Sequence, residues 1–245
     1  MMRTSNPVLS KDVFSRYHSG DSVSKMTVQG VVSKTAILFL CVLATASWSW
    51  AQGSQGLSIG GWFMGASIFG FILAIVMAFK PQYAPVLAPA YSLCQGVTIG
   101  FISSLFERSY PGLVMQAVVL TFSVLGTMLF LYKARIIQAT DRFRRIIMIG
   151  MGAIFLVYFM SMILSFFSVQ IPMIHSSGPI GILFSFVVIG FASFSLIMDF
   201  DFIEQGSRYG APKYMEWYAS FGLIVTLIWI YMEILRLLAK LSDRR

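Results

Sequence analysis

The residues of this chain that could do chemistry are carboxylates in and beside its last two apolar segments. Asp199 and Asp201 come at the end of one apolar run, and Glu216 and Glu233 bracket the next. A charged side chain near the centre of a bilayer costs roughly 2.5–3.5 kcal/mol on insertion scales, so acids in such segments usually serve a function. That function would be an ion pathway, a proton relay or a structural ion pair.

Asp199 and Asp201 cannot both face the interior of a bundle, because two residues along a helix turn the side chain by about 200°. One interpretation is that both are solvated residues at a helix end near the cytoplasmic boundary. The other is that Asp199 faces inward and closes a polar path. Burial and a second nearby acid both disfavour the charged form of a carboxyl group, so Asp199 would then act as a proton-sensitive latch.

The other polar residues in and beside the apolar runs can also be explained by structural roles. Glu233 lies three residues before Arg236, so it forms an ion pair at the membrane boundary or belongs to a pathway. Glu216 could simply be exposed at a helix start, where the dipole favours negative charge. Thr226, near the middle of the last run, is expected to bond back to its own helix. Gln95, in the third run, is expected to find a partner on another helix.

The composition indicates that the segments that carry these residues lie in a membrane. Of the 245 residues, 57% are hydrophobic and 11% are charged, whereas soluble domains have about 25% charged residues. The net charge of +8 does not indicate nucleic acid, because the positive residues flank the apolar runs. Cys41 and Cys94 lie within apolar runs and are expected to be inert buried thiols. His18 and His175 lie far apart in sequence, which disfavours a zinc or haem site.

No catalytic pattern accompanies the acids. The sequence contains neither an HExxH motif nor a phosphate-binding glycine loop. No histidine lies within an apolar run to act as the base for a serine nucleophile. We therefore expect no enzymatic activity, no cofactor and no metal centre.

Seven apolar runs reach the roughly 20 residues that a helix needs to cross hydrocarbon. They are continuous rather than alternating, which favours helices over barrel strands. The runs cover residues 32–51, 58–79, 86–106, 112–132, 146–168, 180–200 and 218–239. The sequence predicts an all-α integral membrane protein, with a seven-transmembrane-helix bundle over residues 31–245 and a flexible polar arm over residues 1–30.

The distribution of positive charge predicts the orientation. With the N-terminus in the cytoplasm, 13 of the 18 lysines and arginines fall on the cytoplasmic side. The last run is expected to cross fully rather than re-enter, although its basic tail then lies outside. Two GxxxG pairs, Gly61 with Gly65 and Gly96 with Gly100, predict close contacts between helices.

Several blocks of the chain resemble one known family. SLIMDFDFIE from Ser195, followed by GAPKYMEWYASFGLIVTLIWIYMEILRLLAKL from Gly210, is similar to the Bax inhibitor-1 (transmembrane Bax inhibitor motif, YccA-like) family, most closely its bacterial members. KPQYAPVLAPAYSLCQG from Lys80 and YPGLVMQAVVLTF from Tyr110 match the same pattern in the right order. The resemblance implies a seven-helix bundle with a central last helix and a pH-sensitive calcium leak across the plasma (inner) membrane. It also implies a link to cell-death suppression in eukaryotes and, for a bacterial member, to a membrane-bound AAA protease.

The resemblance also assigns residues. In the family, the pH response is attributed to two aspartates, one in each of the last two helices, which share a proton and hold the pore shut. Asp199 matches the first, whereas the second falls on Thr226. Either Thr226 makes a neutral hydrogen bond to Asp199, or another acid takes the second place: Glu233, Glu216 or Asp201. Calcium prefers several carboxylate oxygens, so the missing acid predicts weak calcium selectivity or no calcium function.

The leading hypothesis is a cation leak gated by Asp199, with Thr226 as its hydrogen-bond partner. Membrane lipid would surround the protein, and calcium would be the transported ion. Asp201, Glu233 and Gln95 are further pathway candidates, although Gln95 stands where close bacterial relatives are expected to carry Glu. The alternative is a non-conducting membrane regulator that uses the polar arm to bind a partner such as a membrane-bound AAA protease. A proton-coupled transporter is disfavoured, because the sequence shows no internal repeat.

Overall fold

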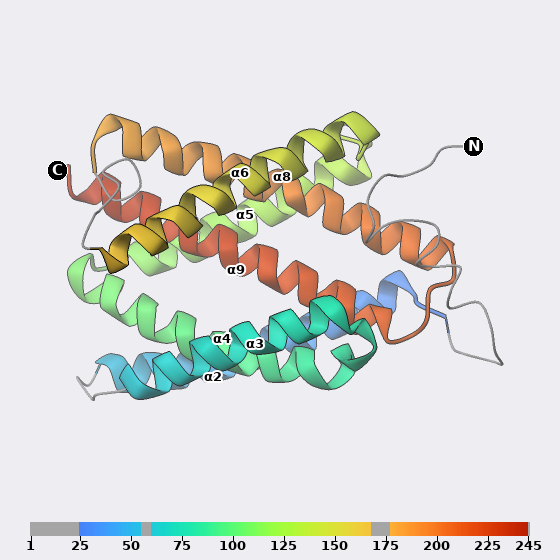
Figure 1. Cartoon of the computed structure of the whole chain (residues 1–245), viewed down its shortest axis with the longest axis horizontal. Helices are drawn as coiled ribbons and strands as arrows, with labels where there is room; N and C mark the ends of the chain where they lie inside the picture. The colour runs from blue at the N-terminus through green and yellow to red at the C-terminus, as the bar shows by residue number, and fades with distance from the viewer. Residues whose placement is uncertain (1–24, 55–59, 168–176, 245) are drawn as a thin grey trace.

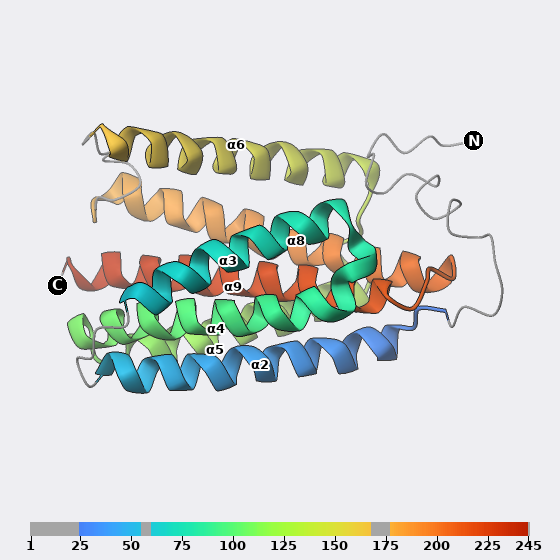
Figure 2. The same ribbon diagram turned by 60° about the horizontal axis from the view of Figure 1, so that its bottom comes forward.

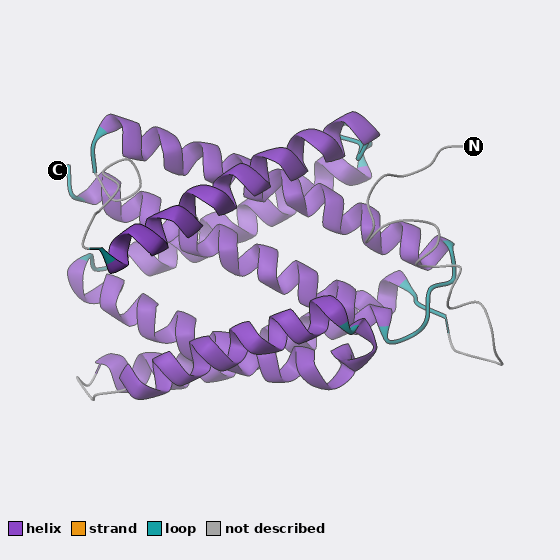
Figure 3. Cartoon of the chain, viewed as in Figure 1, coloured by secondary structure: helices purple, strands orange, loops and turns teal. Residues whose placement is uncertain are grey.

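The computed structural model describes residues 25–54, 60–167 and 177–244, and its regular structure is helical (Figure 3). The elements are α2 (Val28–Ser54), α3 (Gly60–Phe79), the 3₁₀ helix η1 (Pro81–Tyr83), α4 (Ala84–Ser109), α5 (Leu113–Lys133), α6 (Asp141–Phe166), α8 (Pro179–Arg208) and α9 (Met215–Ser242). Seven of these helices are long and apolar enough to cross a membrane. The chain is therefore an all-α integral membrane protein, as the sequence predicts.

The helices begin and end where turn-forming residues stand. Prolines open η1 and α4, and Gly112 adopts a left-handed conformation (φ 83°) between α4 and α5. Thr140 caps α6 by accepting a hydrogen bond from the backbone amide of Phe143 at 3.3 Å. Because of this cap, α6 starts at Asp141, before the apolar run predicted from residue 146, and Arg142, Arg144 and Arg145 lie in its first turns.

α9 is the central helix of the bundle (Figures 1 and 2). α2 and α3 pack on α4, while α5 and α6 pack on α8. α9 contacts α2 and α4 of the first group and α5 and α8 of the second, so it joins the two. It has 28 residues, about 42 Å at 1.5 Å per residue, which is long enough to cross the bilayer. The predicted central C-terminal helix is confirmed.

α2 and α4 form the closest helix contact, through one of the two predicted glycine pairs. Gly96 and Gly100 of α4 face α2, and a Cβ added at Gly100 would lie 2.2 Å from the carbonyl oxygen of Ala46. Thr45 and Ser49 of α2 donate hydrogen bonds of 2.8 Å to carbonyl oxygens of α4. The contact predicted for Gly61 and Gly65 is not found, because no atom of the described residues lies within 4 Å of a Cβ built at either position.

The folded domain begins earlier than residue 31. Lys25 forms an antiparallel bridge with Pro212. The backbone amide of Met26 donates to the carbonyl oxygen of Ala211 at 2.7 Å, and the Met26 side chain is 2% exposed. Residues 1–24 of the expected arm lie outside the described residues. We call the end of the bundle at which α2 begins the basic end, because Lys25, Lys133 and Arg208 lie there.

Candidate functional site

Asp199 of α8 and Thr226 of α9 meet in the interface between the last two membrane helices. The hydroxyl of Thr226 donates to Oδ2 of Asp199 at 2.7 Å. Thr226 is buried and Asp199 is partly buried. Thr226 thus bonds to the neighbouring helix rather than back to its own, which corrects the expectation from its position. The hydrogen bond to Asp199, one of the two arrangements that the resemblance left open, is present.

Asp199 does not lie at a helix end, which corrects the boundary expected from the apolar run. α8 extends to Arg208, so about 14 Å of helix follows Asp199 at 1.5 Å per residue. The helix continues because residues 201–208 are amphipathic. Ile203 and Gly206 are buried on one side, whereas Glu204 and Arg208 form an ion pair with each other on the surface. Asp199 is consequently inside the length of α8, against the central helix.

Asp201 faces α6 instead of α9. The guanidinium of Arg144 forms an ion pair with its Oδ2, and the amide of Gln205 donates to the same oxygen at 2.7 Å. The prediction that the two aspartates point in different directions is confirmed. The Arg144 pair was not foreseen from the sequence, although the Thr140–Asp141 capping signal would have placed Arg144 on a helix.

Glu233 forms the predicted ion pair with Arg236, at 2.8 Å between Nη1 and Oε1. The hydroxyl of Tyr158, from α6, also donates to Oε1 of Glu233 at 2.9 Å. The carboxylate is 3% exposed, and its Oε2 is buried and has no hydrogen-bond partner among the described residues. Two helical turns after Glu233, the ammonium of Lys240 is buried and donates to the Gly181 carbonyl and the Ser185 hydroxyl.

Glu216 is not exposed at its helix start, and that reading of it is wrong. Its carboxylate is fully buried and accepts hydrogen bonds from the Thr27 amide and hydroxyl at 2.9 and 3.0 Å. Lys34 forms an ion pair with one of its oxygens, and Lys213 pairs with the other at 2.9 Å. Gly30 leaves room for the carboxylate, since an added Cβ would lie 2.1 Å from Oε1. We call these residues the Glu216 clamp.

Gln95 does not join this group. It is partly buried, and its side chain hydrogen-bonds to Tyr91, one turn earlier on the same helix. No hydrogen bond to another helix is found for it within the described residues, so the expected interhelical partner is not observed. Glu233 and Glu216 also bond elsewhere, as described above. Of the residues proposed for the second carboxylate's place, only Thr226 contacts Asp199 through a hydrogen bond in the described part of the chain.

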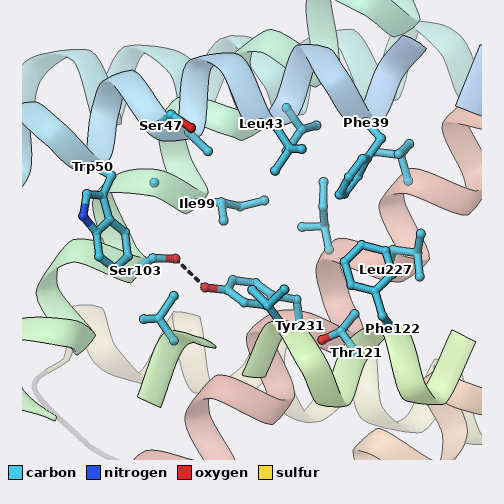
Figure 4. Close-up of a pocket in the computed structure, with 17 residues that line it drawn as sticks. Phe39, Leu43, Ser47, Trp50, Ile99, Ser103, Thr121, Phe122, Leu227 and Tyr231 are labelled. Carbon is cyan, nitrogen blue, oxygen red and sulfur yellow. Dashed lines mark hydrogen bonds between the residues drawn. The ribbon is translucent and has the colours of Figure 1, made fainter. Parts of the chain in front are cut away.

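Two apolar cavities lie beside the central helix. One, of about 360 Å³, lies between α2, α4, α5 and α9 and contains the Ser103–Tyr231 hydrogen bond of 2.6 Å (Figure 4). The second, of about 650 Å³, lies between α2, α5, α8 and α9 towards the basic end. Neither cavity has Asp199 or Thr226 in its wall. In this conformation, neither one connects Asp199 to either end of the bundle.

The acids of the described residues are dispersed rather than gathered. No group of three or more His, Cys, Asp or Glu side chains able to hold a metal ion occurs among residues 25–54, 60–167 and 177–244. Asp201, Glu216 and Glu233 each already have a cationic partner. Asp199 has none among these ion pairs, and a hydroxyl is its hydrogen-bond partner. Of these four acids, Asp199 is therefore the one without a cationic partner among the described residues.

Comparison with protein families identifies the family of this chain. A family model described as Bax inhibitor 1 like matches residues 6–243. The match includes Asp199, Thr226 and the whole described bundle. No curated protein and no solved structure matches the chain.

Proposed function

Because this chain belongs to the Bax inhibitor 1 like family, we propose that it is a pH-sensitive cation leak of the plasma (inner) membrane, with its N-terminus in the cytoplasm and Asp199 as its gating acid. The observation that carries the proposal is the hydrogen bond from Thr226 to Asp199, which joins α8 to the central helix. An acid without a cationic partner inside a membrane helix destabilises the protein, so such a residue usually serves a function. A change in its charge would act directly on the α8–α9 interface.

The latch works through the strength of one hydrogen bond. A carboxylate accepts a charge-assisted bond that is about twice as strong as a neutral one. A change of protonation at Asp199 therefore changes how firmly α8 is held to α9, and separation of the two helices opens a polar path. Since Thr226 does not titrate, one proton controls each latch. The flux should then follow a one-proton curve rather than the steeper curve of two coupled acids.

Ion flux in proteoliposomes tests the proposal. Calcium and potassium flux would be measured across about pH 6 to 8, which brackets a carboxyl group perturbed by its surroundings. Asp199→Asn keeps an oxygen acceptor for Thr226 but cannot change charge, so its flux should stay at the acid limit of the wild type at every pH. Asp201→Asn is the matched control, because it changes an acid two residues away that faces α6.

Thr226 separates hydrogen bonding from charge. Thr226→Val removes the donor and should shift the pH midpoint while leaving a one-proton curve. Thr226→Asp restores a second carboxyl group and should steepen the response and raise the preference for calcium over potassium. A pH response in Asp199→Asn equal to that of the wild type would refute the gating role. Absence of flux in the wild type under every condition would refute the leak itself.

The apolar walls of both cavities favour a second candidate, a non-conducting membrane regulator. Such a protein would bind a partner such as a membrane-bound AAA protease instead of passing ions. Co-reconstitution with a purified protease of that class tests this idea, with ATP-dependent degradation of a model membrane substrate as the readout. A changed degradation rate that is lost on removal of residues 1–24 supports regulation through the polar arm. An unchanged rate with the full-length chain contradicts it.

A further inference from the structure

The larger cavity has the shape of a trough between α2 and α5. Its walls are the α2 residues from Val28 to Phe39 and the α5 residues from Phe122 to Lys133, and its floor is formed by α8 and α9. The rings of Phe39 and Phe122 contact each other, with centroids 5.5 Å apart. Both residues also line the smaller cavity, so they mark the inner end of the trough. Wall residues such as Val32 and Leu129 are 56% and 41% exposed. The trough therefore opens sideways, towards the lipid.

The dimensions of the trough fit one lipid chain. Eleven residues separate its two ends on both α2 and α5, which is about 16 Å at 1.5 Å per residue. One leaflet contributes half of the hydrocarbon core of about 30 Å, so a chain lying along the trough would be about 15 Å long. The volume of about 650 Å³ also lies within the range of about 300–1,000 Å³ that is typical of sites for small ligands.

The mouth of the trough, at the basic end, carries an excess of positive charge. Lys133 lines it, and Arg135 and Arg208 are near enough to act on the charge of Glu204. Glu204 is already satisfied by the Tyr132 hydroxyl and by its ion pair with Arg208. Lys133 and Arg135 are exposed and form no ion pair among the described residues. An anionic group at the mouth would therefore find two available cations.

We propose that this trough binds one acyl chain of an anionic phospholipid from the leaflet at the basic end, with the phosphate against Lys133 and Arg135. The bound lipid fills the gap that α2 and α5 leave beside the central helix. This assignment does not rest on the proposed ion flux, because neither Asp199 nor Thr226 lines the trough.

Native mass spectrometry of the full-length protein in detergent tests the assignment. The probes are phosphatidylglycerol and phosphatidylcholine with identical chains. The wild type should retain one saturable lipid and prefer phosphatidylglycerol. Lys133→Gln should reduce that preference about fivefold, since each basic residue near an anionic headgroup contributes on the order of a fivefold change in affinity. Lys80→Gln, an exposed lysine at the same end that does not line the trough, is the control.

Filling the trough tests the position of the chain. Ala36 lines the cavity, whereas its neighbour Ile37 does not. Ala36→Phe should weaken binding of both lipids, and Ile37→Phe should leave it unchanged, with gel filtration checking that each variant is folded. Equal binding of the two lipids by the wild type, or unaltered binding by Ala36→Phe, would overturn the proposal. A lipid-free dimer in the wild type would overturn it too, because a second copy would then cover the trough.

Discussion

Gly100 is the position at which the packing of this bundle can be tested most sharply. It lies where α4 meets α2, and a Cβ added there would be 2.2 Å from the carbonyl oxygen and 2.8 Å from the Cα of Ala46. Both atoms belong to the backbone, so no side chain can rotate away. Non-bonded carbon and oxygen atoms need about 3.3 Å. Gly100→Ala therefore requires α2 to move by about 1 Å.

The cost follows from this displacement. Overpacking of a closely packed contact costs about 1–3 kcal/mol. The shift would also stretch the hydrogen bonds from Thr45 and Ser49 to α4, which are worth about 0.6 kcal/mol each in a membrane protein. Alanine recovers up to about 1 kcal/mol of helix propensity. We expect a net loss of about 2 kcal/mol, which lowers the Tm of a chain of this size by about 4–8 °C.

Gly65→Ala is the matched control. Gly65 is also a helical glycine of a GxxxG pair, but no atom of the described part of the chain lies within 4 Å of its added Cβ. Its apparent Tm should stay the same or rise slightly. Both variants would be heated in the same detergent at one scan rate, since membrane proteins commonly unfold irreversibly. Equal Tm shifts for the two variants would refute the argument that backbone contact, rather than glycine itself, sets the cost.

Three further predictions concern the ends of the bundle. Removal of residues 1–24 should leave the apparent Tm unchanged, whereas removal of residues 1–30 should lower it, because only the second deletion takes Thr27 from the Glu216 clamp. Glu216→Gln should lower the Tm far more than Glu204→Gln, since breaking a buried ion pair costs about 3–5 kcal/mol and an exposed one about 0–1 kcal/mol; similar losses would contradict the clamp. Donation from the Tyr110 and Ser177 hydroxyls lowers the pKa of Asp243 below its ordinary 3.8. The two hydrogen bonds that hold the end of α9 to Tyr110 and Ser177 therefore stabilise the protein above that pH, and this stabilisation is lost as the pH falls below it. Hydrogen exchange at this helix end, corrected for intrinsic rates, should rise in acid for the wild type and already at neutral pH for Asp243→Ala.

The apolar runs predicted the helices well, because crossing hydrocarbon imposes a length and a composition that few other structures share. All seven predicted spans are helices in the structure, and the differences are in the residues at which the helices begin and end. α8 continues eight residues beyond Phe200, since polar residues that pair with neighbouring helices do not interrupt a helix as they interrupt a hydropathy pattern. For the same reason Asp199, expected at a helix end, lies within the helix.

Hydropathy and the turn angle of a helix suffice to predict seven membrane-spanning helices and different directions for Asp199 and Asp201. The neighbour that each polar group meets depends instead on how the helices pack. Glu216 became buried because Thr27 and Lys34 come to it from the other end of the chain. Gly100 contacts a neighbouring helix whereas Gly65 does not. Partners this distant in sequence are chosen by how the helices pack around α9, which no local pattern encodes.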